Sequence, residues 1–402
     1  MKVATRLVAL VCVLGALALG AAPAVAQPGR VSAESTAAPK VDVYTFEVGS
    51  LIFQKFGHAA LCLTYDERRP DNAPCFNYGI TNYNEGGKLV WGFLRGKQKF
   101  WVAAERLGRM LESYVDEDRT IWKQRLPITD DQARAIADKL WFDVKEENRY
   151  YYYDHFYDNC SSRLRDIIDA ATGGKLRTDT AGKHFGLTFR EAGARGLGPF
   201  PEILALGDFL VGRALSKTPT MWQAMFLPDV LRTQVEASFG VAPEVVYARK
   251  GVRLPWATDA APPSTFGRWA TLLLALVFAL PLLLAQWRRR FQRLALGWAL
   301  VPLILWGLII WGVVIISAIP SLRLNEAALV LMPIDIIIPF LGPRRRRLYA
   351  LGRVGLLLLA SILCAIGVLQ APLWVPIITA FLPLAIIGFD LPRMQPLPPK
   401  RG

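Results

Sequence analysis

The chain has 402 residues, of which 53% are hydrophobic and 20% are charged, and its mean hydropathy is positive. A soluble globular protein carries roughly a quarter charged residues, so this composition excludes a disordered or fibrous chain and argues against a purely soluble one. The net charge of +14 is concentrated in residues 266–402, among apolar segments. Basic residues in such places set membrane topology, and we expect no nucleic-acid partner.

The N-terminus has the three parts of a secretory signal peptide. Lys2 and Arg6 are basic, residues 7–19 are apolar, and residues 24–26 are small. This order predicts a cleaved signal peptide over 1–26 and an exported mature chain; an uncleaved N-terminal anchor is the alternative. Residues 27–40 are small and polar, which predicts a linker.

Residues 41–265 form one domain-sized unit that mixes strand and helix patterns. The segments 41–49, 56–65 and 75–83 read as neighbouring strands, which favours an antiparallel meander. A capped amphipathic helix is predicted after Thr129. We therefore expect an α+β exported domain.

Five cysteines have different surroundings. Cys12 leaves with the signal peptide, and Cys364 lies in an apolar run. Cys62 and Cys75 flank a short polar segment between two predicted strands and could form a disulfide in an oxidising compartment. Cys160 then remains as a free thiol.

Cys160 lies at a predicted helix start. Asp158, Asn159 and Ser161 are residues typical of helix N-termini, and apolar residues then recur on one helical face, at Leu164, Ile167, Ile168 and Ala171. A helix N-terminus stabilises a thiolate, and Arg163 would add positive potential. Because polar residues flank Cys160, a nucleophile is favoured over a buried structural cysteine.

A thiol nucleophile needs a base, and the chain has three histidines. His58, at the start of the second predicted strand, is the natural candidate. His155 is close to Cys160 in the chain and is expected to pack or cap, and His184 lies in a glycine-flanked loop. A zinc site made of Cys160, His58 and His184 lacks the usual close ligand pairs, so neither metal nor cofactor is expected.

The motifs FGHAALCL, FNYGI and YYDHFYDNCSSRLRD together resemble the Lnb-type periplasmic domain over roughly residues 41–235. The resemblance implies a papain-like, circularly permuted fold similar to lecithin:retinol acyltransferase, with a Cys160–His58 dyad. It also implies N-acylation of bacterial lipoproteins, with a phospholipid as acyl donor and a diacylglyceryl lipoprotein as acceptor. The motif residues that could support the dyad are Asn77, Tyr78, Tyr153, Asp158, Asn159, Ser161 and Arg163.

Residues 266–402 read as an all-α membrane domain of about five spans, predicted at 269–287, 294–319, 327–342, 348–369 and 372–389. Basic residues cluster in alternate connections and in the tail, which places those parts in the cytoplasm. The domain 41–265 would then lie in the periplasm of a bacterium, attached to the inner membrane.

Polar residues interrupt the third predicted span. Asn325 and Glu326 precede it, and Asp335 lies within it beside Pro333. Ionisable groups inside a membrane are costly and often functional; a wetted position at a helix break is the alternative.

The sequence thus predicts a membrane-bound, cysteine-dependent acyltransferase that transfers a phospholipid acyl chain through a thioester to the N-terminal amine of lipoproteins. One alternative is a periplasmic thiol peptidase or amidase acting on cell-wall peptides, for which five spans would be only an anchor. Another is a non-enzymatic membrane scaffold.

Overall fold

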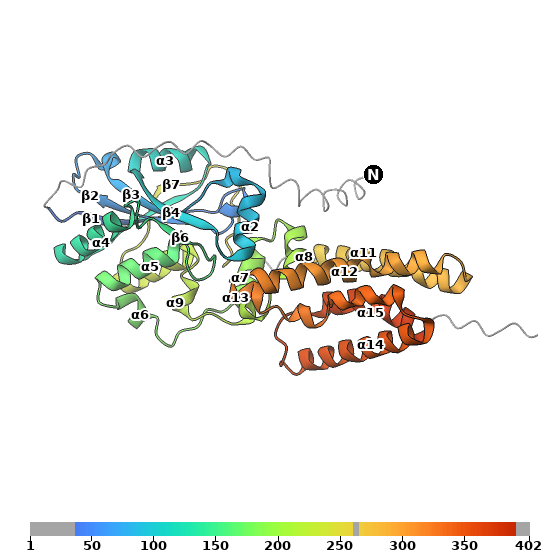
Figure 1. Cartoon of the computed structure of the whole chain (residues 1–402). Coiled ribbons are helices and arrows are strands. Elements are labelled where there is room, and N and C mark those ends of the chain that lie inside the picture. The colour runs from blue at the N-terminus through green and yellow to red at the C-terminus, as the bar shows by residue number, and fades with distance from the viewer. Residues whose placement is uncertain (1–36, 260–264, 391–402) are drawn as a thin grey trace, which may run out of the picture. The chain divides into compact units, whose positions relative to one another are not determined.

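The computed structural model describes residues 37–259 and 265–390, which divide into two compact units. Unit 1 holds the chain up to Pro199 and Lys217–Pro263, and unit 2 holds Phe200–Ser216 and the chain from Ser264 onward (Figure 1). The predicted signal peptide 1–26 and most of the linker 27–40 lie outside the described residues. Residues 200–216, which the sequence places in the exported domain, belong to unit 2.

Unit 1 is built on a seven-stranded antiparallel sheet with the strand order β6-β4-β3-β2-β1-β5-β7. Its first four strands lie next to one another in chain order, and β1, β2 and most of β3 are buried on both faces. This confirms the α+β class. The strands are β1 (Lys40–Phe46), β2 (His58–Thr64), β3 (Pro74–Ile80), β4 (Lys99–Arg106), β5 (Ile121–Arg125), β6 (Tyr150–Tyr152) and β7 (Glu244–Tyr247).

The register of β2 positions both a disulfide and a candidate catalytic residue. Cys62 pairs with Cys75 of β3, and the two form a disulfide with a Cα–Cα distance of 4.0 Å. On the other side, His58 pairs with Phe46 at the end of β1. The first residue of β2 is therefore held by its pairing with the last residue of β1.

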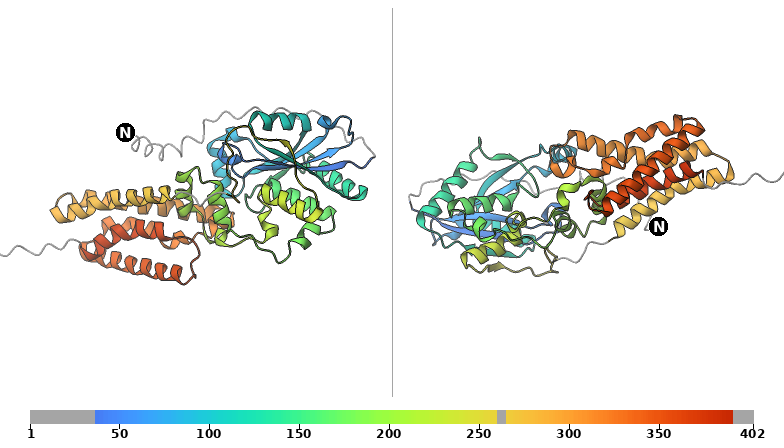
Figure 2. Two further views of the ribbon diagram at one scale, coloured as in Figure 1. Left: turned by 180° about the vertical axis from the view of Figure 1, so that it is seen from behind. Right: turned by 90° about the horizontal axis from the view of Figure 1, so that it is seen from below.

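Helices cover both faces of this sheet (Figures 1 and 2). On one face, α3 (Leu107–Asp116) packs against β3 and β4; on the other lie α4 (Asp130–Asp143), which follows the predicted cap Thr129, and α5 (Cys160–Ala171), which packs against β2 and β3. The remaining elements of unit 1 are η1 (Ile52–Gln54), η2 (Pro70–Asn72), η3 (Tyr83–Glu85), α2 (Gly87–Arg95), α6 (Lys175–Asp179), α7 (Phe189–Gly196), α9 (Met221–Ala224) and α10 (Pro228–Phe239).

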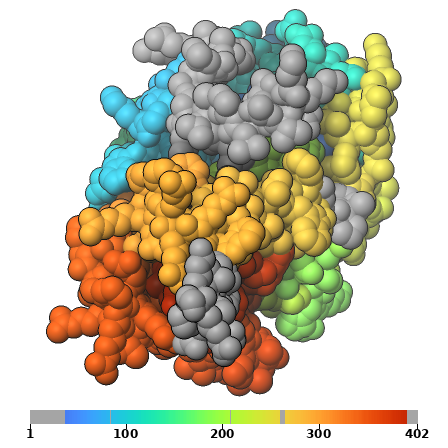
Figure 3. All heavy atoms as spheres, turned by 90° about the vertical axis from the view of Figure 1, so that its right-hand side faces the viewer, coloured from blue at the N-terminus to red at the C-terminus, as the bar shows by residue number. Residues whose placement is uncertain are grey.

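Unit 2 contains long apolar helices that lie side by side (Figure 2) and whose side chains form part of the surface in Figure 3. Among the described residues, three helices are long and apolar enough to cross a membrane: α11 (Phe266–Arg288), α12 (Gln292–Ile316) and α14 (Pro343–Ala365). The helix α15 (Trp374–Phe389) is apolar but shorter. The other elements are α8 (Pro201–Leu210), η4 (Arg213–Ser216), α13 (Pro320–Arg323), η5 (Glu326–Leu329) and η6 (Pro333–Phe340).

The predicted third span, 327–342, is not one continuous helix. It consists of η5 and η6, and the second of these contains Pro333 and Pro339. Proline removes a backbone donor and clashes with the preceding turn, so this apolar segment breaks where the sequence pattern suggested a single span. Five membrane-spanning helices are therefore not confirmed.

The polar residues of this segment are all bound inside unit 2. Asp335 is fully buried and forms a bidentate ion pair with Arg353, with Nε–Oδ1 and Nη2–Oδ2 distances of 2.9 Å. Glu326 accepts hydrogen bonds from the backbone N–H groups of residues 370 and 371, and Asn325 donates to the carbonyl of Phe209. These contacts link the broken segment to its neighbours, so Asp335 lies inside the unit rather than at a wetted break.

Candidate functional site

Cys160 is the first residue of α5, and Asn159 is the cap that starts this helix. The Ser162 N–H donates to Asn159 Oδ1 at 2.9 Å, and the Asn159 N–H donates to Ser162 Oγ at 2.8 Å. Asn159 Nδ2 also donates to the carbonyls of His155 and Phe226, both at 2.8 Å. The amide oxygen and the amide nitrogen of Asn159 thus both form hydrogen bonds with backbone groups. The cap therefore fixes the position of Cys160 at the helix start.

The Cys160 sulfur is buried against the strand that begins at His58. Burial raises the pKa of this thiol, while the backbone N–H of Ala59, the Ser161 hydroxyl and the N–H groups of Ser161 and Cys160 act to lower it. A helix N-terminus alone would favour the thiolate, as the sequence suggested. Desolvation outweighs that effect here, and the resting group is a thiol.

His58 is held by an amide on the neighbouring strand. Its Nε2 lies 3.0 Å from Oδ1 of Asn77, and its ring stacks near Phe46 and Tyr114, with centroid distances of 6.0 and 6.2 Å. Burial lowers the pKa of His58 to about 4, the Asn77 contact opposes this shift, and Arg119 adds to it. The imidazole is therefore neutral at pH 7.

A second hydrogen bond decides which imidazole nitrogen is the base. Asn77 Nδ2 donates to Oε1 of Glu105 at 2.9 Å, so the amide oxygen is the atom that faces His58. An oxygen accepts, and His58 Nε2 must then carry the proton. The lone pair of the neutral ring lies on Nδ1.

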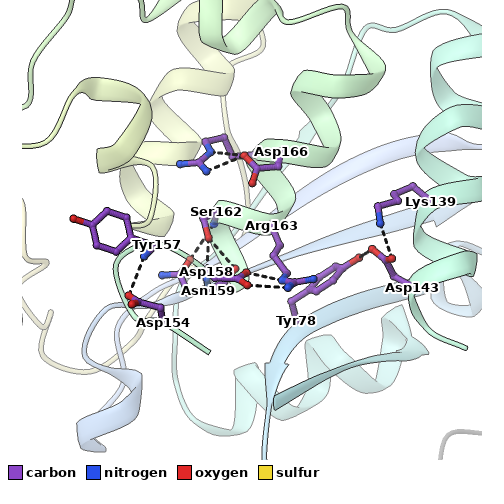
Figure 4. A network of polar contacts seen from close by, with 11 residues as sticks. Tyr78, Lys139, Asp143, Asp154, Tyr157, Asp158, Asn159, Ser162, Arg163 and Asp166 are labelled. Carbon is purple, nitrogen blue, oxygen red and sulfur yellow. Dashed lines mark hydrogen bonds and ion pairs between the residues drawn. The ribbon is translucent and has the colours of Figure 1, made fainter. Parts of the chain in front are cut away.

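The charged residues beside Cys160 form a separate network (Figure 4). Arg163 binds Asp158 through two contacts of 2.6 and 2.8 Å and lies over the Tyr151 ring at 3.7 Å. Tyr78 donates to Asp143 at 2.7 Å. Asp158 compensates the charge of Arg163, so this arginine anchors the helix start rather than supplying an unpaired positive charge to the thiol.

Two residues beside Cys160 had not been singled out from the sequence. At Gly79, φ is +90°, and an added Cβ would lie 3.7 Å from Cys160 Cβ and 3.9 Å from the Tyr151 hydroxyl. Burial raises the pKa of Tyr151, and the nearby Cys160 raises it further. In β6, Tyr150 and Tyr152 are exposed and Tyr151 is buried, and a run of three tyrosines carries no sequence signal that separates them.

Tyr153, which was expected to support the dyad, packs near Gly79. Its ring stacks on Phe100 at 4.3 Å and meets Phe93 edge-on at 6.2 Å. The ring also lies 3.7 Å from the position of an added Cβ at Gly79. Tyr153 therefore forms part of the apolar wall beside the candidate nucleophile.

The other two histidines lie elsewhere in unit 1. His155 is surrounded by the rings of Phe56, Phe156 and Phe226, at centroid distances of 4.3, 4.9 and 5.7 Å. His184 is exposed and forms an isolated bridge with Thr220. Within the described ranges, no group of three His, Cys, Asp or Glu side chains is placed to hold a metal ion.

The arrangement combines a buried thiol at a helix start, a neutral imidazole on the strand beside it and an amide that orients the imidazole. A Cys, His and Asn set of this kind serves nucleophilic acyl transfer in papain-like proteases. Among known proteins, residues 31–191 match the model of the family described as the Lnb N-terminal periplasmic domain. No curated protein and no solved structure matches the chain.

Proposed function

Because residues 31–191 are an Lnb N-terminal periplasmic domain, we propose that the chain is a cysteine-dependent acyltransferase of the bacterial inner membrane. Its donor is a phospholipid, and its acceptor is the free α-amine of a diacylglyceryl lipoprotein. Cys160 is the nucleophile, His58 is the base and Asn77 orients His58. The apolar helices of unit 2 would anchor the enzyme in the membrane, where both lipid substrates are located.

In the first half-reaction, His58 Nδ1 accepts the proton of the Cys160 thiol as the sulfur adds to the carbonyl carbon of the phospholipid ester. The C–O bond of the ester then breaks, and the leaving oxygen takes the proton from His58. Lysophospholipid departs, and an acyl thioester remains on Cys160. The N–H groups of Ala59, Cys160 and Ser161 surround the sulfur and can stabilise the negative oxygen that forms.

In the second half-reaction, the lipoprotein amine adds to the thioester carbonyl and gives its proton to His58. The C–S bond breaks, the sulfur takes the proton back, and an amide is formed. The pair begins and ends as neutral thiol and neutral imidazole, and no cofactor is consumed.

The observation that carries this proposal is the hydrogen bond between His58 Nε2 and Asn77 Oδ1. It leaves Nδ1 as the basic atom on the residue next to Ala59, whose N–H reaches the Cys160 sulfur.

The direct test is to trap the intermediate. Full-length protein in detergent is incubated with a phospholipid that carries a labelled acyl chain, and peptides are analysed by mass spectrometry. The proposal requires an acyl group on the peptide containing Cys160, sensitive to hydroxylamine and absent from Cys160→Ala. A Cys364→Ala variant, which keeps Cys160, should still be labelled. An unlabelled Cys160 with released lysophospholipid would contradict the covalent mechanism.

The same residues could serve a thiol peptidase or amidase, so cell-wall peptides are included as a second substrate. Cleavage of muropeptides without acyl transfer would favour that alternative. If Cys160→Ala retains full function in cells, the chain is a scaffold and both enzymatic readings are wrong.

A further inference from the structure

Unit 1 contains a cavity of about 490 Å³ that none of the residues of the candidate dyad lines. This volume lies in the range of small-molecule sites, roughly 300–1,000 Å³. The cavity lies between the end of β1, the strand β5, the helix α10 and the segment 248–259. Its wall combines aromatic and charged side chains, including Trp122, Trp256, Arg232 and Arg249.

Most of the charged groups in this wall are already paired. Arg249 Nε lies 2.9 Å from Glu47 Oε2, and Arg253 forms an ion pair with Asp259. Asp229 accepts hydrogen bonds from the Thr258 hydroxyl and the Val230 N–H. The carboxylates of the wall are thus directed to other partners.

Arg232 differs from these residues. Its guanidinium stacks over Trp122 at 4.0 Å and lies 5.5 Å from the Trp256 ring, and its Nη1 is buried with no hydrogen-bond partner. Asp229, one turn earlier on α10, attracts it without a hydrogen bond. A buried guanidinium N–H without an acceptor is costly, and the Arg232 side chain lines the cavity.

Trp256 connects the cavity to the candidate active site. Its ring closes over Gly57, where an added Cβ would lie 2.6 Å from Cζ3. Gly57 immediately precedes His58 and adopts a φ of +77°. One side of Trp256 thus packs against Gly57, the residue before β2, and the indole also lines the cavity.

We propose that this cavity binds a phosphodiester group, with Arg232 as its anchor. A planar guanidinium presents paired donors to two oxygens of one oxyanion, and the tryptophan rings keep the guanidinium in place through cation–π contact. The assignment of this phosphodiester to the phospholipid donor rests on the proposed function. The existence of the binding site does not depend on that function. Only the Trp256 ring would separate a head group bound here from Gly57, the residue before β2.

The test measures binding alone. Full-length Cys160→Ala protein in detergent, which cannot turn over, is titrated by calorimetry with glycerophosphoglycerol, with a short-chain phosphatidylglycerol and with glycerol. Both phosphodiesters should bind and glycerol should not. Arg232→Met, which keeps an apolar chain over Trp122, should weaken binding at least about tenfold.

Arg177→Met is the matched control. Arg177 also stacks on a tryptophan, lying 4.2 Å from the Trp222 ring, but it does not line the cavity. Its replacement should leave affinity unchanged. If Arg232→Met does not fold, the Cys160→Ala protein is instead modified with phenylglyoxal, with and without glycerophosphoglycerol. Peptide mass spectrometry should show that the ligand protects Arg232 from modification and does not protect Arg177.

The outcomes separate the two sources of the group. Tighter binding of phosphatidylglycerol than of glycerophosphoglycerol, with both dependent on Arg232, assigns a lipid head group; equal binding assigns a soluble phosphodiester. Absence of binding, or equal affinity of the Cys160→Ala protein with and without the Arg232→Met substitution, overturns the site. Because no acyl transfer is measured, the site can stand when the proposed function fails, and the reverse also holds.

Discussion

His58 Nε2 lies 3.0 Å from Asn77 Oδ1, and the same amide donates to Glu105 at 2.9 Å. This chain of contacts runs across adjacent strands, β2 to β3 and β3 to β4. It sets the tautomer of His58, because the amide can face the imidazole only with its oxygen. The basic lone pair is therefore determined by a carboxylate two strands away.

Replacing Asn77 by Ala should slow thioester formation about 5- to 150-fold, since the loss of one partner of a buried polar group costs about 1–3 kcal/mol. The Asn77 contact raises the pKa of His58, so its loss should also move the acidic limb of the rate profile to lower pH. The readout is lysophospholipid release across pH. Asn148→Ala, which removes a solvent-exposed hydrogen bond to the Phe142 carbonyl, is the control. An unchanged limb in Asn77→Ala would refute the positioning role.

The base and the nucleophile should differ in their response to pH. Cys160→Ala should be inactive at every pH. His58→Ala should be inactive at neutral pH and should partly recover the first half-reaction as pH rises above about 8.5, the ordinary thiol value, because burial raises the pKa of Cys160. His155→Ala and His184→Ala serve as comparisons. An inactive His184→Ala protein together with a fully active His58→Ala protein would show that the base is misassigned.

Acid should destabilise unit 1 through its buried histidines. Burial lowers the pKa of His155 from 6.5 to about 4, so the unfolded chain binds the proton first as pH falls. Neutral His155 makes its full contribution to the free energy of unfolding above pH 6.5. This contribution, up to about 2–3 kcal/mol, is lost as pH falls toward 4. His155→Phe should reduce this loss, as measured by thermal unfolding between pH 7.5 and 4.5. The exposed His184→Gln should have no effect, and an unchanged acid slope in His155→Phe would contradict the argument.

The Cys62–Cys75 disulfide closes a loop with a sequence separation of 13. Its removal in a Cys62→Ala/Cys75→Ala variant should lower the free energy of unfolding by roughly 3 kcal/mol in the chain-entropy description. Folded molecules should keep most of their activity, because neither cysteine touches the site. Denaturant unfolding with parallel activity assays tests both statements. Without reductant, the wild-type protein should not react with thiol reagents at Cys62 or Cys75.

Reporter fusions can decide whether the broken segment of η5 and η6 crosses the membrane. A reporter active only in the periplasm should work when fused after Asp259 and be silent at Arg345, because the basic residues at the start of α14 favour the cytoplasm. Activity at both positions would mean that the segment of η5 and η6 does not cross the membrane, so that α14 begins in the periplasm. A fusion after Arg289 should be silent in either case.

Local patterns determined much of this protein from the sequence alone. The cap at Asn159, the start of α5 at Cys160 and the helix after Thr129 depend on residues a few positions apart, and capping chemistry acts over that distance. The antiparallel order of the first strands followed from short connections between alternating segments. Cys160 and His58 were recognisable as candidates for the same reason.

Only the tertiary structure decided features that depend on distant contacts. Asn77 was named from its motif, but its bond to His58 comes from the pairing of β2 with β3. The pKa of Cys160 rises because the folded chain removes its sulfur from water, a cost that no local pattern contains. Proline chemistry explains why the apolar run 327–342 breaks into η5 and η6, but only the folded unit brings Asp335 to Arg353, 18 residues away. Burial and register are properties of the whole fold, so these features could not be predicted from neighbouring residues.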